Sequence, residues 1–221
     1  MTDLHDRYNA WLAARTQAPA ELIHGLNGPA CDLVTLDAKG LADRDWPADF
    51  PPDLAVVAPG RLAYGGYAED RAIYDTPNFA AGEEPRTIHL GVDIFAAAGT
   101  PVFAPLDGRI HSFQDNANPK DYGPTIILEH DVGALVFYTL YGHLSRESLV
   151  SLDIGKPFAA GNRLAALGEA GVNGGWPPHL HFQVILDLMD QSGDFPGVCR
   201  ASERARWLRI CPDPGPLLGR P

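Results

Sequence analysis

Histidine and aspartate occur at close spacing in two short segments, RTIHLGVDIF (residues 86–95) and HLHFQV (residues 179–184). In an extended strand, alternate side chains lie on the same face. In the first segment, His89 and Asp93 would then share a face, with only the hydrogen of Gly91 between them. The residues on the opposite face are all apolar. The segment therefore predicts one strand that packs against a core and presents an imidazole and a carboxylate, with room for an ion near the backbone.

The second segment follows the same pattern. His179, His181 and Gln183 would lie on one face of a strand, and the leucine, phenylalanine and valine between them on the other. Burying two neighbouring imidazoles without a polar partner would cost several kcal/mol. A metal ion is the usual partner, and a set of two histidines and one aspartate suits Zn²⁺ with one position open for water.

A third segment, LYGHLS, contributes one more histidine. Alternation would place Tyr141, His143 and Ser145 on one side of a strand, so His143 can face the same site. Trp176, in NGGWPPHLHF, is equally well explained as the rim of the site or as a packing residue. The remaining histidines lack such a context, and we interpret them as surface or locally satisfied residues: His5, His24, His111 and His130.

The elements that must position these residues are mostly short strands. Glycine and proline number 23 and 20 of 221 residues, and 45% of the chain is apolar, which favours a folded chain with many turns. From about residue 85, β-type runs are separated by turn residues, which predicts a mainly β fold, an antiparallel sheet or sandwich. Apolar residues at helical spacing predict a helix over residues 3–15. We therefore expect an N-terminal extension, partly helical and irregular (residues 1–60), and a β domain (residues 61–221) with its motif core at 86–184 and a C-terminal tail.

The charge balance excludes several classes of partner. Seventeen lysine and arginine residues face 28 acidic residues, a net charge of −11. Nucleic acid requires a basic footprint, so we expect no nucleic-acid partner. No stretch approaches the roughly 20 apolar residues of a membrane span. The first residues lack the basic region and apolar run of a secretory signal, so the sequence predicts a cytoplasmic location. Cys31, Cys199 and Cys211 are interpreted as reduced thiols, with a Cys199–Cys211 disulfide left open.

Taken together, these motifs resemble the lysostaphin-type (LytM-like) zinc metallopeptidases, a family of peptidoglycan endopeptidases. The family pattern is HxxxD, then GHL, then HxH, and the chain has His89–Asp93, Gly142–Leu144 and His179–His181 in that order. The connecting segments GTPVFAPLDGRI and GKPFAAGNRLAALGEAG are also similar to the family. The resemblance covers residues 86 to 184, close to half of the chain.

The resemblance implies a compact, mostly antiparallel β-sheet with a zinc site in a groove. It implies that His89, Asp93 and His181 bind zinc and that His143 and His179 are the catalytic histidines. The expected activity is that of a zinc metalloendopeptidase, a hydrolase of a peptide or amide bond, most simply one in peptidoglycan. A neutral histidine beside a zinc-bound water could accept its proton, but the sequence does not choose between the two histidines.

Other interpretations remain open. Family members are commonly periplasmic or extracellular, which conflicts with the cytoplasmic prediction. The segments YGGYAEDRAIYDTPNF and CPDPGPLLG resemble those that flank this module where it is fused to kinase-like and aminotransferase-like domains, which suggests a cytoplasmic hydrolase of a small amide. A noncatalytic zinc-binding regulatory module is a further alternative. An Fe(II) oxygenase would also use two histidines and one carboxylate, but it would leave His143 and His179 unexplained.

Overall fold

The computed structural model describes residues 3–74, 79–80, 84–133 and 135–219. Residues 75–78, part of the flanking segment YGGYAEDRAIYDTPNF, lie outside the described residues. The helices are α1 (Leu4–Ala14), α2 (Ala38–Asp43) and α3 (Arg204–Ile210), with short 3₁₀ turns η1 (Ala72–Tyr74), η2 (Arg146–Leu149), η3 (Ala201–Glu203) and η4 (Gly215–Leu218). The strands are β1 (Cys31–Leu33), β2 (Leu62–Gly65), β3 (Arg86–His89), β4 (Val92–Phe95), β5 (Pro101–Phe103), β6 (Gly108–Asn116), β7 (Gly123–Asp131), β8 (Val136–Gly142), β9 (Pro157–Phe158), β10 (Arg163–Ala166), β11 (His179–Ile185) and β12 (Val198–Arg200).

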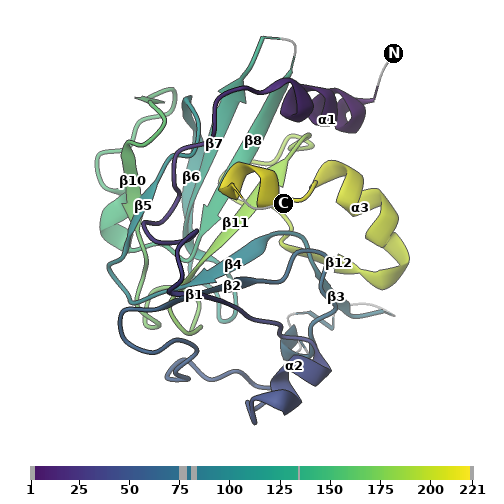
Figure 1. Cartoon of the computed structure of the whole chain (residues 1–221), viewed down its shortest axis with the longest axis vertical. Helices are drawn as coiled ribbons and strands as arrows, with labels where there is room; N and C mark the ends of the chain where they lie inside the picture. Colours follow the sequence, from purple (N-terminus) through teal and green to yellow (C-terminus); the bar gives the residue numbers. More distant parts are fainter. Residues whose placement is uncertain (1–2, 75–78, 81–83, 134, 220–221) are drawn as a thin grey trace.

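Eight of these strands form one twisted sheet in the order β1-β2-β4-β11-β8-β7-β6-β9, and two small ribbons, β10–β5 and β12–β3, lie beside it (Figure 1). The mainly β fold expected from the sequence is confirmed. Most neighbouring strands are antiparallel, but β1 and β2 are parallel. A parallel pair needs a crossover connection, and the segment between β1 and β2, which includes α2, provides it.

The expected N-terminal helix is confirmed as α1. Asp3 caps it, because its carboxylate accepts the backbone N–H of His5. Tyr8 on α1 is fully buried, and its ring packs edge-on against that of Phe137 in β8, 5.2 Å between centroids. Figure 1 shows α1 lying across the β7–β8 end of the sheet. This helix therefore packs against the same core as the sheet.

The segment RTIHLGVDIF forms two strands, so the expectation of a single strand was wrong. The extended backbone is interrupted at Leu90 and Gly91. Before the interruption, β3 pairs with β12, and after it, β4 pairs with β2 and β11. A Cβ on Gly91 would lie 2.7 Å from the Phe182 carbonyl oxygen and 2.8 Å from the His181 ring. Only glycine allows the chain to pass this close to β11 while it changes direction.

The two faces of the large sheet differ in what covers them. One face carries the largest apolar cluster, which includes Leu180, Phe182 and Val184 of β11. On the other face, polar side chains lie between two smaller clusters. One contains Phe50, Phe95 and Trp176, and the other contains residues of β3, β11 and the α3 region. The alternation of β11 thus separates the core from the polar face, as its sequence predicted.

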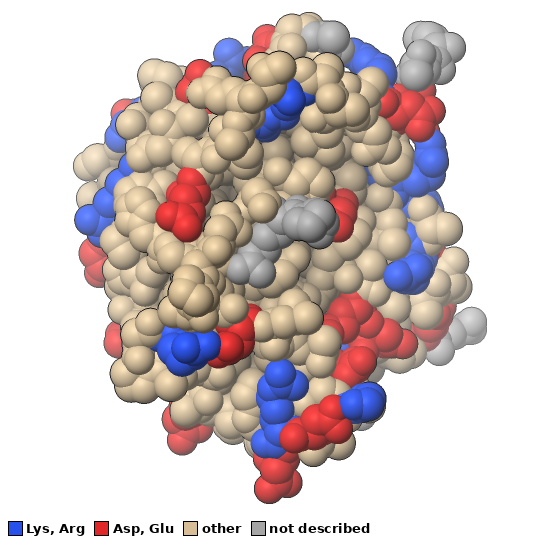
Figure 2. Space-filling view, viewed as in Figure 1, with Lys and Arg blue, Asp and Glu red and all other residues tan. Residues whose placement is uncertain are grey.

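Residues before position 60 take part in both kinds of packing. Strand β1 extends the large sheet beyond β2, and Phe50 packs in the cluster with Phe95. The division of the chain at residue 60 stays a prediction. Charged side chains of both signs lie around the edge of the face drawn in Figure 2, with a few acidic ones nearer its middle. Among the described residues, no helix combines the length and apolar character needed to cross a membrane.

Candidate metal centre and active site

Two neighbouring strands bring Asp93 and His181 together. In the antiparallel pair β4–β11, these two residues are direct partners, so their side chains leave the same face of the sheet side by side. His181 also pairs with Gly142 at the end of β8, where no side chain occupies the third position. Asp93 Oδ1 lies 3.3 Å from His181 Nδ1, and both side chains are buried.

His89 reaches the same point from the end of β3. Its Nε2 atom lies 2.9 Å from His181 Nδ1 and 3.4 Å from Asp93 Oδ1. The structure therefore places His89, Asp93 and His181, the three predicted zinc ligands, with one potential ligand atom each within 4.8 Å of the others. All three are at most 3% exposed.

Hydrogen bonds on the far side of each ring determine which nitrogen carries the proton. His89 Nδ1 lies 2.8 Å from the Gly66 carbonyl oxygen, which can only accept, so Nδ1 is the donor. His181 Nε2 lies 2.9 Å from Gln183 Oε1. The Gln183 amide nitrogen donates to the Pro196 carbonyl, so its oxygen faces the ring and His181 Nε2 also donates. The other nitrogen of each ring therefore faces the other ring and Asp93.

Three acceptor atoms thus converge with no donor between them. Asp93 Oδ1 is fully buried and has no hydrogen-bond partner. Burial lowers the pKa of His89 to about 3, with a further contribution from the charge of Arg71, so this ring does not supply a proton. Burial of the carboxyl would raise the pKa of Asp93, but the surrounding imidazoles and the Arg71 guanidinium hold it well below its ordinary value. Two imidazole nitrogens and one carboxylate oxygen in this arrangement fit a divalent metal ion.

His143 and His179 stand beside this triad. Their rings lie 4.1 Å apart between centroids, and His179 Nε2 is 3.8 Å from Asp93 Oδ1. His143 Nδ1 donates to the Asn173 carbonyl at 2.8 Å and His179 Nδ1 to the Pro177 carbonyl at 2.7 Å. Burial lowers the pKa of both rings, that of His143 furthest. Both are therefore neutral at pH 7, each with Nε2 as an acceptor.

The position of His143 does not arise from alternation along a strand. Strand β8 ends at Gly142, and His143 has a left-handed backbone with φ of 61°. Tyr141 lies in the apolar core on the other face of the sheet, so the expectation that it shares a side with His143 was wrong. The turn at His143, rather than the strand, directs the imidazole towards the metal centre.

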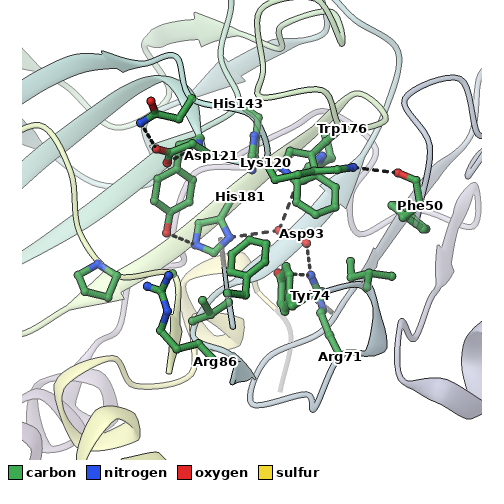
Figure 3. A pocket seen from close by; sticks show the side chains of 18 of the residues that line it. Phe50, Arg71, Tyr74, Arg86, Asp93, Lys120, Asp121, His143, Trp176 and His181 are labelled. Atoms are coloured by element: carbon green, nitrogen blue, oxygen red, sulfur yellow. Dashed lines mark hydrogen bonds and ion pairs between the residues drawn. The ribbon is translucent and has the colours of Figure 1, made fainter. Parts of the chain in front are cut away.

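A cavity of about 520 Å³ opens onto these side chains (Figure 3). One part of its wall is aromatic, formed by Phe50, Tyr74, Phe79, Phe95 and Trp176. Trp176 is only 5% exposed, so it is both a packing residue and part of the wall. Lys120 lies 3.9 Å above the Trp176 ring, and its ammonium donates to the Phe50 carbonyl at 3.3 Å. Lys120 thereby joins the segment around Phe50 to the loop that precedes β11.

Several polar residues of the site were not assigned from the sequence. Arg71 binds the other oxygen of Asp93, Glu69 binds Arg71, and the Tyr122 hydroxyl lies 3.5 Å from His181 Nε2. Gln183 was placed on the correct face of its strand, but without a role. Arg71 and Glu69 lie in the segment YGGYAEDRAIYDTPNF, whose sequence showed only a resemblance to segments that flank this module in fused proteins. The feature of the sequence that could have indicated their role is an acidic and a basic residue shortly after the tripeptide YGG.

None of the three cysteines forms a disulfide with another described residue. Cys199 and Cys211 are buried near the α3 region, and Cys31 is partly exposed on β1. Burial raises the pKa of Cys199 to about 12, so this thiol stays protonated. The structure therefore contains reduced thiols and no disulfide among the described residues.

Residues 87–192 match the sequence profile of the family described as Peptidase family M23. This segment contains all five histidine and aspartate residues of the site. This match, over just under half of the chain, confirms the predicted resemblance to the lysostaphin-type metallopeptidases.

Curated relatives agree with this assignment. The chain is 37% identical over 99 residues to a protein of Haemophilus influenzae named an uncharacterized metalloprotease, a match that covers 45% of this chain and 19% of the relative. It is 32% identical over 100 residues to the DD-carboxypeptidase/endopeptidase Mpg of Neisseria meningitidis, which covers 45% and 20%. The matched part of the chain thus spans about a fifth of these relatives.

Among solved structures, the chain is similar to the catalytic domain of the antimicrobial peptidase lysostaphin from Staphylococcus simulans. The match has 25% identity and a TM-score of 0.45, and it covers 71% of this chain and 88% of that domain.

Proposed function

We propose that this protein is a zinc-dependent hydrolase of a peptide or amide bond, with His89, Asp93 and His181 as the zinc ligands. One observation carries the proposal: two imidazole lone pairs and an unpartnered carboxylate oxygen converge in a buried site with no donor between them. A buried set of acceptors is costly unless a cation binds it. Zn²⁺ bound there would supply Lewis acidity towards a carbonyl oxygen and lower the pKa of a bound water towards 7.

The protein's own residues would move the protons. His143 and His179 are neutral acceptors at pH 7, and each is held by a backbone carbonyl, so the Nε2 lone pair keeps its direction. Either Nε2 can take a proton from an attacking water and return it to a leaving amine. Once protonated, the same ring can donate a hydrogen bond to the developing oxyanion. His143 and His179 are therefore the proposed catalytic residues.

The proposed substrate class is a peptide of the peptidoglycan type, supported by the family and by the names of the Neisseria relatives. The cavity of about 520 Å³ is of the size that holds a small ligand or a short peptide segment. Its aromatic wall includes Phe50, which lies before the family match. A small amide unrelated to the cell wall is the second substrate class to test, and with it a cytoplasmic location.

The deciding experiment measures metal content and turnover together. The full chain is expected to hold one zinc ion, to hydrolyse either peptidoglycan peptides or one member of a cytosolic amide library, and to lose that activity on chelation. Added Zn²⁺ should restore it. Iron with oxygen-dependent turnover would refute the hydrolase, and zinc binding with no cleavage of any amide would favour the noncatalytic module.

A further inference from the structure

Arg71 is a fully buried cation next to the proposed metal centre. Its side chain is 2% exposed, and it lies outside the segment that matches the family. The Nη1 atom donates to Asp93 Oδ2 at 2.5 Å, and Nε donates to Glu69 Oε2 at 2.8 Å. Burying an arginine costs several kcal/mol unless its donors are paired, and here two acidic side chains pair with the guanidinium.

The contact with Arg71 is on one particular oxygen of Asp93. Oδ2 is occupied by the guanidinium, whereas Oδ1 faces His89 and His181. A free carboxylate can rotate about its last bond and can present both oxygens to a cation. With Oδ2 held, the carboxylate has one oxygen left for a metal ion and one orientation.

Arg71 is itself held from three sides. Glu69 Oε1 accepts the backbone N–H of Leu36 at 3.0 Å, which fixes the carboxylate that binds Arg71. The Tyr74 hydroxyl lies 3.1 Å from Nη1. The backbone at Gly66 passes so close that a Cβ there would lie 1.8 Å from Arg71 Nη2. Figure 3 shows Arg71 reaching the Asp93 carboxylate beside Tyr74.

The same short segment also holds a second ligand of the site. The Gly66 carbonyl accepts the Nδ1–H of His89, which directs His89 Nε2 towards the metal centre. The stretch from Gly66 to Arg71 therefore contacts His89 through its backbone and Asp93 through its side chain. Partners of this kind orient metal ligands in many proteins.

We propose that Arg71 is a positioning residue of the metal centre, which holds Asp93 as a one-oxygen ligand, and that Glu69 holds Arg71 in place. This inference rests on the metal site of the proposed function. A positioning role and a purely electrostatic role of Arg71 predict opposite changes in zinc affinity when its side chain is replaced. The positive charge of Arg71 would by itself repel Zn²⁺, so a purely electrostatic role predicts tighter binding when the charge is removed. A positioning role predicts weaker binding.

The experiment compares Arg71→Met and Arg71→Lys with a matched control, Arg146→Met, which breaks an exposed ion pair with Asp115. Zinc affinity of the full chain is measured by competition with a chelator, and Co²⁺ replaces zinc for visible absorption. We expect Arg71→Met to bind zinc about 10- to 100-fold more weakly. Its Co²⁺ absorption should fall, because a second carboxylate oxygen raises the coordination number. Arg71→Lys should lie between Arg71→Met and the wild type, and Arg146→Met within twofold of the wild type.

Equal or tighter zinc binding by a natively folded Arg71→Met protein, with an unchanged Co²⁺ spectrum, would overturn the proposal. If Arg71→Met lacks the native circular dichroism, Glu69→Gln takes its place. That variant keeps Arg71 but weakens its support, so several-fold weaker zinc binding is expected and unchanged binding refutes the role. Zinc affinity needs no substrate. A wild type with Arg71-dependent zinc binding but no hydrolysis would therefore refute the proposed activity and leave this inference intact.

Discussion

Two groups of buried histidines in this protein differ in how their ring nitrogens are satisfied. His130 on β7 is fully buried, and both of its nitrogens have protein partners: Nδ1 donates to the Asp107 carbonyl at 2.8 Å, and Nε2 lies 2.7 Å from the Thr139 hydroxyl oxygen. The histidines of the metal centre are equally buried, but each has a protein partner that fixes only one nitrogen. The second nitrogen of His89 and of His181 faces other acceptors.

This difference separates a structural histidine from a ligand more sharply than burial does. Burial lowers the pKa of His130 to about 4 and that of His89 to about 3, so both rings are neutral. His130 needs nothing further, because its polar atoms are paired within the protein. In the metal centre, lone pairs of His89 and His181 have no donor among the described residues. Because they converge on one point, a bound cation would satisfy them together.

The largest expected effect follows from removing one ring from each group. His89→Ala should abolish zinc binding, because two protein ligands do not hold the ion. His130→Ala should keep zinc and lose stability instead. The measurement is metal content after dialysis, combined with urea unfolding. Full zinc occupancy in His89→Ala would show that an unsatisfied ring nitrogen does not distinguish a metal ligand from a structural histidine.

The second effect concerns catalysis without metal loss. His143→Ala should retain zinc and lower turnover by about 10²- to 10⁴-fold, the usual contribution of a general acid or base. His24→Ala, in which an exposed histidine is changed, serves as the control and should keep wild-type turnover. Wild-type turnover in His143→Ala would exclude His143 from the mechanism.

The third effect is the pH dependence of stability. The pKa of His130 is about 4 in the folded protein and about 6.5 when unfolded, so the unfolded state binds the proton first as the pH falls. The contribution of His130 is therefore complete above pH 6.5 and is lost as the pH falls towards 4, by about 3 kcal/mol in total. Urea unfolding of metal-free protein between pH 7 and 4 should show a smaller pH dependence for His130→Gln. Identical slopes would contradict this assignment.

The smallest expected effect tests the second partner of His130. Thr139→Val leaves His130 Nε2 without its hydrogen-bond partner in a buried site, which should cost about 1 to 3 kcal/mol of unfolding free energy. Zinc content should not change. Urea unfolding at pH 7 measures the loss, and an unchanged midpoint would show that the Thr139 hydroxyl contributes nothing to this site.

The sequence predicted the strand that carries His179 and His181 correctly, because alternation along a strand is a local property. It failed at two places where the chain turns. Gly91 divides the segment of His89 and Asp93 into two strands, and the left-handed backbone at His143 ends the alternation with Tyr141. At both places the backbone meets segments distant in the chain, β11 at Gly91 and residues 122 and 168 at His143, and a single segment does not contain these contacts.

By itself, the sequence determined the donor types of the site, the apolar face of β11 and the order of the motifs, since these depend on residue identity and spacing within a few positions. Only the tertiary structure decided that Asp93 and His181 are direct partners, because their strands are far apart in the chain. The carbonyl or amide oxygen that fixes each ring, and the pairing of Arg71 with Asp93, also depend on distant segments meeting. Residue identity supplies the nitrogen and oxygen ligands, and contacts between distant segments set the direction of their lone pairs.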